Sequence, residues 1–214
     1  MNELRTIGHS NHPLDHFIDL LKMHAITAVG DVRSSPYSRF SPQYNRESLH
    51  RALKESSIAY VFLGEELGPR SEDPSCYVDG KVRYALLAGT DLFRRGLERL
   101  KIGMAKFRIA LMCAEKDPIT CHRMILVCRA LRRDGFVIRH ILGDGAVEDL
   151  RDAELRLLRT LKMPQLRIFD TVEDLIQRAY DTQADRIAHV RSEEVLDEHE
   201  PEPREEDPEE EQCT

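Results

Sequence analysis

The sequence has no apolar run approaching about 18 residues, and it does not open with a charged segment followed by an apolar one. The first absence argues against a membrane-spanning helix, and the second against a secretory leader. The five cysteines show no short disulfide-scaffold spacing, which fits a reducing compartment. No repeat with a period of about 20–50 residues is visible. These absences lead us to expect a cytoplasmic protein that does not enter a membrane.

Charge is distributed unevenly along the chain. Residues 193–214 contain twelve acidic residues, three prolines and a single basic residue, Arg204. Such a block cannot bury enough apolar surface to fold, so we predict that it is disordered. The rest of the chain has 26 acidic and 30 basic residues, a net charge of +4. We predict one α/β domain over residues 1–190 and an acidic tail over 191–214, which either aids solubility or competes with a polyanionic ligand for the basic body.

Short β-rich runs alternate with helical periods. The expected strands are Leu4–Gly8, Ile26–Val32, Ile58–Leu63, Phe107–Met112 and Val137–Leu142. The expected helices are Pro13–His24, Arg46–Ser56, Tyr84–Gly103, Pro118–Arg133, Val147–Lys162 and Val172–His189, and a long connection runs from Gly64 to Gly80. Strands separated by helices indicate a parallel sheet with right-handed crossovers. The sequence thus predicts a three-layer, doubly wound, mostly parallel sheet of about five strands, followed by C-terminal helices.

Polar residues and glycines follow each expected strand. In doubly wound sheets, ligands bind outside the carboxyl ends of the strands. The segments that reach this edge are Gly8-His9-Ser10, Asp31-Val32-Arg33, Gly64-Glu65, Cys113-Ala114-Glu115 and Gly143-Asp144-Gly145. We therefore expect one shared site at the carboxyl edge.

Several of these segments occur in a characteristic order. The series is Thr6-Ile7-Gly8-His9-Ser10, Asp31-Val32-Arg33, Leu67-Gly68, Cys113-Ala114-Glu115, Cys121-His122-Arg123 and His140-Ile141. Over about residues 4–142 the chain resembles the bacterial family catalogued as domain of unknown function 488. The resemblance implies a small cytosolic α/β protein and brings no agreed activity.

The densest group of polar residues lies between Cys113 and Arg123. A helix N-terminus near residue 118 would attract an anion and lower the pKa of a nearby thiol. Arg123 could grip a phosphate with two hydrogen bonds. The layout also resembles the active-site loop of rhodaneses and cysteine phosphatases, but those loops are short and rich in glycine, whereas residues 113–123 contain none.

Three other interpretations of this stretch stay open. A metal site would use Cys113, Cys121 and His122, with His9 as a fourth candidate. Against it, the gap between the cysteines is not that of a zinc ribbon, and consecutive Cys-His ligands are awkward on one helical turn. A redox pair would join Cys113 to Cys121 in a reversible disulfide. A purely structural role would pair Glu115 with Arg123 and bury both thiols, as we expect for Cys128, which lies among apolar residues.

Arginines are the candidate anion ligands. Arg33, Arg39, Arg70 and Arg123 could converge on the carboxyl edge and bind a phosphate. With Ser10 and Asp31 they form the predicted ligand-binding set, although Asp31 and Arg33 share a strand face and could equally form an ion pair. The aromatic residues Tyr37, Phe40 and Tyr44, interleaved with Arg39 and Arg46, either stack on bases or anchor a loop.

The leading hypothesis is an enzyme that acts on a nucleotide or nucleic-acid-related anion. The predicted catalytic residues are His9, Glu65, Glu115, Cys121 and His122, with His9 as a general base and the two glutamates as its partners. No metal ligand is assigned, and the cofactor and oligomeric state are left undetermined. The alternatives are a thiol or metal protein with a redox or sensing role, and a nucleic-acid-binding adaptor regulated by the acidic tail.

Overall fold

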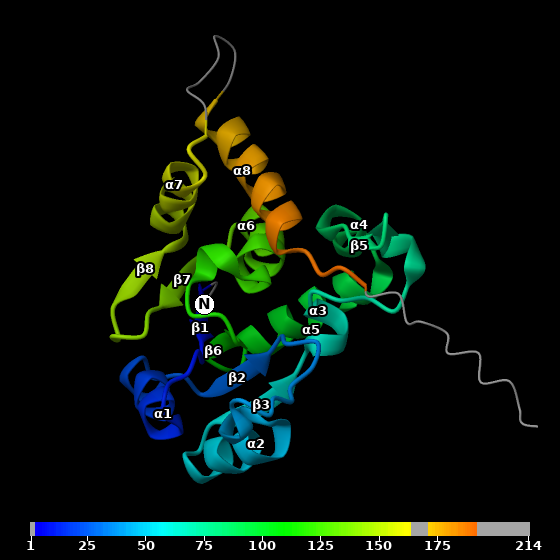
Figure 1. Cartoon of the computed structure of the whole chain (residues 1–214). Helices are drawn as coiled ribbons and strands as arrows, with labels where there is room; N and C mark the ends of the chain where they lie inside the picture. Colours follow the sequence, from blue (N-terminus) through cyan, green and yellow to red (C-terminus); the bar gives the residue numbers. More distant parts are fainter. Residues whose placement is uncertain (1–2, 164–170, 192–214) are drawn as a thin grey trace, which may run out of the picture.

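The computed structural model of the chain describes residues 3–163 and 171–191, and its centre is a six-stranded sheet. Figure 1 shows this sheet surrounded by helices. The strands are β1 Glu3–Gly8, β2 Ala28–Asp31, β3 Ala59–Phe62, β6 Ile109–Cys113, β7 Val137–Ile141 and β8 Val147–Asp149, in the spatial order β3-β2-β6-β1-β7-β8. The first five pair in parallel, and β8 joins β7 antiparallel. The predicted mostly parallel α/β sheet is confirmed, and β8 is an addition at its edge.

Helices cover both faces of the sheet, as three layers require. The longer helices are α1 Leu14–Met23, α2 Arg46–Glu55, α5 Asp91–Met104, α7 Leu150–Thr160 and α8 Val172–Ile187. The apolar sides of α1 and α2 pack against one face through residues such as Phe17 and Leu49. The other face, which carries Cys113, is buried under α5, α7, α8 and the helical segment after residue 122. Because β6 is central and covered on both sides, all five of its residues are buried.

The long connection predicted from Gly64 to Gly80 contains short elements. They are α3 Gly64–Leu67, a 3₁₀ turn Pro74–Cys76 and a small hairpin of β4 Tyr77–Val78 and β5 Lys81–Val82, after which α4 covers Tyr84–Ala88. Hence the single helix expected over Tyr84–Gly103 is two helices, because Gly89 ends α4 and the Thr90 side chain caps α5 by accepting from the Phe93 N–H. In Figure 1, α4 and β5 lie to the right of the sheet, and Lys81 of β5 pairs with Val190 just after the end of α8.

The helix predicted over Pro118–Arg133 is wrong in its first part. Asp117 and Pro118 begin a 3₁₀ turn, Pro118–Thr120, and Cys121 then adopts an extended conformation with φ −126° and ψ 140°. A π-helix, Arg123–Cys128, and the short α6, Arg129–Arg133, follow. π-Helical turns are frequent at functional sites. The extended residue matters because it places Cys121 on a bend, and only His122 begins the helical segment, so the two do not share one helical turn.

The helix predicted to begin at Val147 begins three residues later. Val147–Asp149 instead form β8, since their backbone groups pair with Arg139–Ile141. Thr171 begins α8 with a capping box that involves Asp174. The predicted acidic tail falls almost entirely on residues 192–214, outside the described residues, and so does Cys213.

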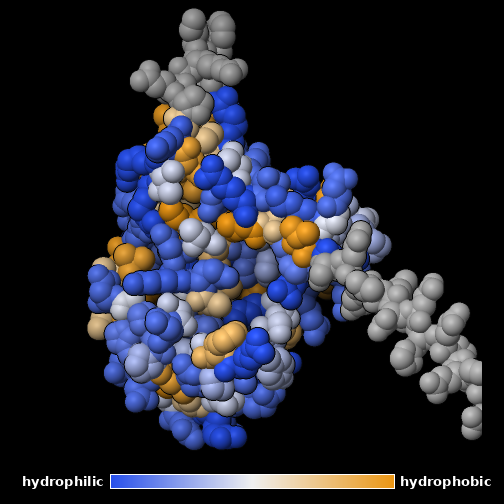
Figure 2. All heavy atoms as spheres, in the orientation of Figure 1, coloured by the Kyte–Doolittle hydropathy of each residue, from blue (hydrophilic) through white to orange (hydrophobic). Residues whose placement is uncertain are grey.

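The surface is predominantly polar on the face drawn in Figure 2, where hydrophobic residues lie in separate groups. Among the described helices, none combines the length and the apolar composition that crossing a membrane would need.

Candidate functional site

The carboxyl ends of β1 and β6 lie side by side and set the base of the site. The His9 N–H donates to the Cys113 carbonyl at 2.9 Å, and the Ser10 N–H donates to the Ala114 carbonyl at 2.9 Å. Gly8 lies directly beneath this loop, and a Cβ there would overlap the carbonyl oxygen of Glu115. The structure shows that the glycine admits the chain's own loop, which brings Glu115 over the end of the sheet.

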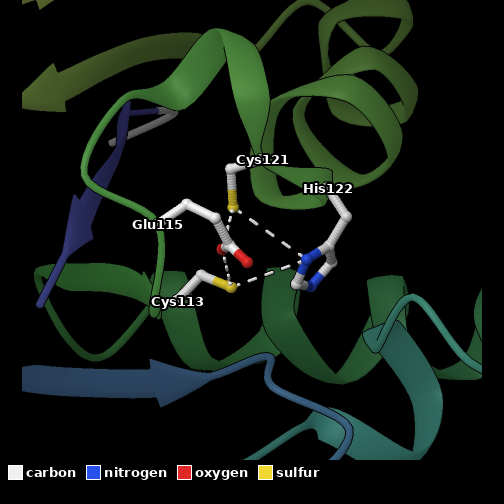
Figure 3. A group of neighbouring side chains, drawn as sticks. All are labelled: Cys113, Glu115, Cys121 and His122. Atoms are coloured by element: carbon white, nitrogen blue, oxygen red, sulfur yellow. Dashed lines mark hydrogen bonds between the residues drawn. The ribbon is translucent and has the colours of Figure 1, made fainter. Parts of the chain in front are cut away.

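Four side chains converge above this point (Figure 3). Cys113 ends β6, Glu115 follows on the loop, and Cys121 and His122 return from the bend. One donor atom from each side chain lies within 4.8 Å of all the others. The two thiols donate to Glu115 Oε2, at 2.8 Å from Cys113 and 3.0 Å from Cys121. Sulfur, nitrogen and carboxylate oxygen from these four residues therefore enclose one small space.

The ring of His122 is fixed in one orientation. Its Nε2 donates to the Val32 carbonyl at 2.8 Å, so Nδ1 carries the lone pair when the ring is neutral. Burial alone would lower the pKa of this ring, but its contacts with Cys121 and the charge of Glu115 outweigh burial, and the pKa is raised. Nδ1 lies 3.5 Å from the Cys113 sulfur and 3.9 Å from the Cys121 sulfur. Histidines that bind metals are commonly held in this way, with the N–H of the other ring nitrogen donating a hydrogen bond to a backbone carbonyl. The sequence did not indicate this contact, because it is made by a backbone carbonyl and not by a side chain. Val32 nevertheless lies inside the Asp31-Val32-Arg33 motif.

The four side chains differ in their access to solvent. Cys113, Cys121 and His122 are buried, whereas Glu115 is exposed. Burial alone would raise the pKa of Glu115, but the hydrogen bonds from the two thiols outweigh it, and the pKa is lowered. Burial raises the pKa of Cys121 well above its usual value, so without a bound cation this thiol is protonated. The cluster thus has an ionised carboxylate on its open side.

Arg123 has a different role from the predicted phosphate ligand. It is fully buried, and its two terminal nitrogens donate to the carbonyls of Glu115 at 2.6 Å and Lys116 at 3.1 Å. Its backbone N–H also points at the Cys121 sulfur, 3.4 Å away. The side chain therefore braces the Glu115 loop through its backbone, and the carboxylate-to-arginine pair of the structural interpretation does not form.

Arg33 is likewise occupied within the chain. It makes a buried ion pair with Asp31, whose second oxygen is 2.7 Å from the guanidinium, and it also donates to the Tyr44 carbonyl at 2.9 Å. Its remaining terminal nitrogen lies 3.3 Å from His9 Nε2. Of the two interpretations of the Asp31 and Arg33 motif, the ion pair is present. For Arg33 to bind a ligand, its ion pair with Asp31 would have to break.

His9 is poorly suited to act as a general base near neutral pH. It is buried, its ring stacks on Tyr44 at 4.1 Å, and its Nδ1 lies 2.8 Å from the Ser10 carbonyl. Desolvation, followed by the charge of Arg33, lowers its pKa to about 4. The lone pair on Nε2 faces the Arg33 guanidinium. His9 is therefore a neutral histidine that contacts Arg33 of the Asp31–Arg33 ion pair.

A third buried histidine, His140, makes stability dependent on pH. Desolvation lowers its pKa to about 3, and its Nδ1 lies 2.8 Å from Thr6 Oγ1. His9 and His140 both have folded-state pKa values below the usual 6.5, so the unfolded chain binds more protons between pH 6.5 and about 4. The free energy of unfolding should consequently fall on acidification by about 1.4 kcal/mol per pH unit for each histidine.

Urea unfolding at pH 7 and pH 5, with chelator present, measures this effect. His140→Gln should reduce the dependence by about 1.4 kcal/mol per pH unit, because one of the two histidines whose pKa is lowered furthest no longer contributes. An identical dependence in the parent and in His140→Gln would contradict the assignment of His140 as a neutral buried group.

The other predicted residues lie apart from the four-residue cluster. Arg39, Arg70 and Glu65 are exposed, and Ser10 is half-buried with φ +50°. The Arg39 guanidinium covers the Phe40 ring, while Glu65 lines a separate hollow of about 420 Å³ beside the edge strand β3. The predicted convergence of four arginines is not observed, since two are buried in internal contacts and two are on exposed loops.

The aromatic residues near Arg39 behave differently from one another. Tyr44 is buried and anchors its loop by donating to the His12 carbonyl at 3.0 Å. Tyr37 donates to Glu47, and Phe40 is largely exposed. Cys128 is buried within the core, as predicted. All four cysteines that the structure describes carry free thiols.

Comparison with known proteins identifies a family. The family model described as Domain of unknown function DUF488 matches residues 13–130, more than half of the chain. The matched stretch includes Cys113, Glu115, Cys121 and His122. No curated protein and no solved structure matches the chain.

Proposed function

The chain belongs to the family described as Domain of unknown function DUF488, and we propose, from the geometry of its own side chains, that it is a zinc-dependent enzyme. Cys113, Cys121 and His122 would hold the ion. Glu115 would be the exchangeable partner on the open side. The proposal selects the metal alternative of the sequence analysis, with Glu115 in place of His9 as the fourth donor.

The observation that carries the proposal is the convergence of two sulfurs, an imidazole lone pair and a carboxylate oxygen within 4.8 Å. Zinc–ligand bonds of about 2.0–2.3 Å place tetrahedral donors roughly 3–4 Å from one another. The four donor separations that involve a thiol with Glu115 or with His122 are 2.8, 3.0, 3.5 and 3.9 Å, and all donors lie within 4.8 Å of one another. Thiolate and imidazole ligands also favour zinc over magnesium or calcium.

The surroundings of these donors support the same conclusion. The Val32 carbonyl fixes the His122 tautomer, and the Arg123 backbone N–H points at the Cys121 sulfur. Such outer contacts orient ligands and tune a bound metal. The earlier objection to adjacent Cys-His ligands does not apply, because Cys121 is extended and its side chain leaves the backbone in a different direction from that of His122.

A catalytic role is supported by the exposure of Glu115. Structural zinc sites are closed by four protein ligands, whereas catalytic sites have three and an exchangeable fourth position. Three of the donors here are buried and one is exposed. Nucleobase deaminases use a zinc with one histidine and two cysteines together with a glutamate that moves protons. The deaminase glutamate is not a zinc ligand. If water took the place of Glu115 beside the ion, the carboxylate would be positioned to accept a proton from that water and to return it to the leaving group of the substrate.

An anionic, nucleotide-related compound remains our prediction for the substrate. The exposed Arg39 and Arg70 are the arginines left to attract it, because Arg33 and Arg123 make internal contacts. A reducing, cytoplasmic environment would keep Cys113 and Cys121 available as ligands. The redox alternative needs the same two sulfurs, and the zinc content of the purified protein separates the two.

Cobalt substitution tests whether the fourth position exchanges. The visible spectrum of the cobalt-loaded full chain should change on titration with azide, because the anion can displace Glu115. In Glu115→Gln the azide affinity should rise several-fold, since a neutral amide is a weaker competitor for the ion. Glu65→Gln is the matched control, for its carboxylate is exposed and lies apart from the cluster. A cobalt spectrum unaffected by azide in every variant would indicate a closed, structural site.

A further inference from the structure

Arg123 and His140 each contain a buried polar atom that no other part of the described chain satisfies. Both side chains are completely buried. Arg123 donates from its two terminal nitrogens to backbone carbonyls, and His140 places Nδ1 2.8 Å from Thr6 Oγ1. Within residues 3–163 and 171–191, no group forms a hydrogen bond with Arg123 Nε or with His140 Nε2. An unmet polar atom is costly away from water, so each of the two requires a partner.

The two side chains lie over the same face of β1. Thr6 and Gly8 are two positions apart in this strand, so they face the same side of the sheet. Thr6 is in register with His140 of β7 and contacts its ring. A Cβ built on Gly8 would lie 3.2 Å from Arg123 Nη1, so the guanidinium covers the next position on that face. His140 and Arg123 are therefore neighbours above β1, on the face to which Cys113 also belongs.

The hydrogen-bonding capacities of the two unmet atoms are complementary. Burial, followed by the charge of Arg123, lowers the pKa of His140 to about 3, so the ring is neutral at pH 7. A neutral imidazole has one N–H and one nitrogen lone pair, whereas Arg123 Nε can only donate. If Nδ1 of His140 carries the proton, it donates to the Thr6 hydroxyl, and Nε2 is left as the acceptor. The ring can thus satisfy both neighbours in one tautomer only.

We propose that one buried water joins the two atoms, by accepting a hydrogen bond from Arg123 Nε and donating one to His140 Nε2. Internal waters commonly take such positions, because they form hydrogen bonds with buried polar groups that have no other partner. Arg123 in turn donates to the carbonyls of Glu115 and Lys116. His140 is therefore a positioning residue, which holds Arg123 and, through Arg123, the loop that carries Glu115.

The tautomer of His140 tests the link in the absence of any metal. In NMR spectra of the isotope-labelled full chain with chelator present, the ring signals that disappear in His140→Gln belong to His140. These signals should show a neutral ring with its proton on Nδ1. A proton on Nε2 would make that atom a donor, which cannot accept from the water, and would overturn the inference.

Two substitutions of His140 test its effect on Glu115, and this effect rests on the proposed function. His140→Gln keeps an amide oxygen near the position of Nε2, whereas His140→Leu occupies the space without a polar atom. In cobalt-loaded His140→Leu, azide should bind about 2- to 10-fold more tightly than in the parent, because loss of one hydrogen bond loosens the loop and lets Glu115 leave the ion more readily. His140→Gln should bind azide nearly as the parent does.

Ile138→Val is the matched control for these variants. Ile138 lies on the same strand and the same face as His140 and is also buried, but its side chain is apolar. The variant should melt at a lower temperature and bind azide as the parent does. Unchanged azide affinity in His140→Leu would overturn the positioning role and leave the zinc proposal standing, and an equal gain in Ile138→Val would overturn that role by attributing the effect to core damage. A parent that binds neither cobalt nor azide would overturn the zinc proposal and the role at the ion, whereas the tautomer decides the buried link separately.

Discussion

Cys113→Ser and Cys121→Ser should each abolish stoichiometric zinc binding, which the purified parent is expected to show at one ion per chain. Each substitution removes one of the three buried donors and replaces a thiolate with a hydroxyl that is much harder to deprotonate. Loss of an outer-shell contact already weakens a metal site by about 10- to 100-fold, so loss of a ligand should weaken it by more than about 100-fold. Elemental analysis after gel filtration measures the stoichiometry, and competition with a coloured chelator measures the affinity.

Cys128→Ser provides the matched control for these variants. Cys128 is as deeply buried as Cys113 and Cys121 and belongs to the same core, but it is not part of the donor cluster. The Cys128→Ser variant should have a lower free energy of unfolding and should still bind one zinc ion per chain. Chelator should lower the melting temperature of the parent and of Cys128→Ser, because an ion bound only to the folded state stabilises it. Equal zinc loss in all three variants would attribute the effect to core damage and contradict the metal site.

The general fold could be predicted because it depends on local patterns. The alternation of strands and helices places Cys113 at the end of a buried strand and Glu115 just beyond it, and both positions are confirmed. The order of strands could not be predicted, since β1 pairs with β6 through residues about a hundred positions apart. The edge strand β8 was also missed, because Val147 continues into a helical period and only its pairing with β7 identifies it.

The position of the candidate site at the edge of the sheet could be predicted from the sequence, but the contacts among its side chains could not. Asp117 and Pro118 begin a 3₁₀ turn as readily as an α-helix, so the bend at Cys121 gives no local signal. The groups that an arginine side chain contacts are determined by tertiary packing and cannot be read from its neighbours in the sequence. Arg123 therefore looked like a phosphate ligand until its contacts with the Glu115 and Lys116 carbonyls were known.

Asp31→Ala should produce the largest loss of stability among single substitutions near the site. Asp31 is completely buried, and it accepts hydrogen bonds from Arg33 and from the Tyr60 hydroxyl. Its removal would leave the Arg33 guanidinium buried without a counter-charge, which typically costs about 3–5 kcal/mol. Urea unfolding of the metal-free chain measures the free energy. Asp91→Ala, which removes an exposed pair with Arg94, should change it by less than about 1 kcal/mol.

The double variant Asp31→Ala/Arg33→Met separates the ion pair from a ligand role. Removing both charges removes the unpaired guanidinium, so the double variant should recover a large part of the stability that Asp31→Ala loses. Val32 lies between the two residues, and its carbonyl holds the His122 ring. Asp31→Ala should therefore also weaken zinc binding, whereas the double variant should regain part of the affinity together with its stability. Normal stability in Asp31→Ala, combined with lost binding of an anionic ligand, would show instead that the pair exists to bind that ligand, because a supporting pair cannot be removed without cost to the fold.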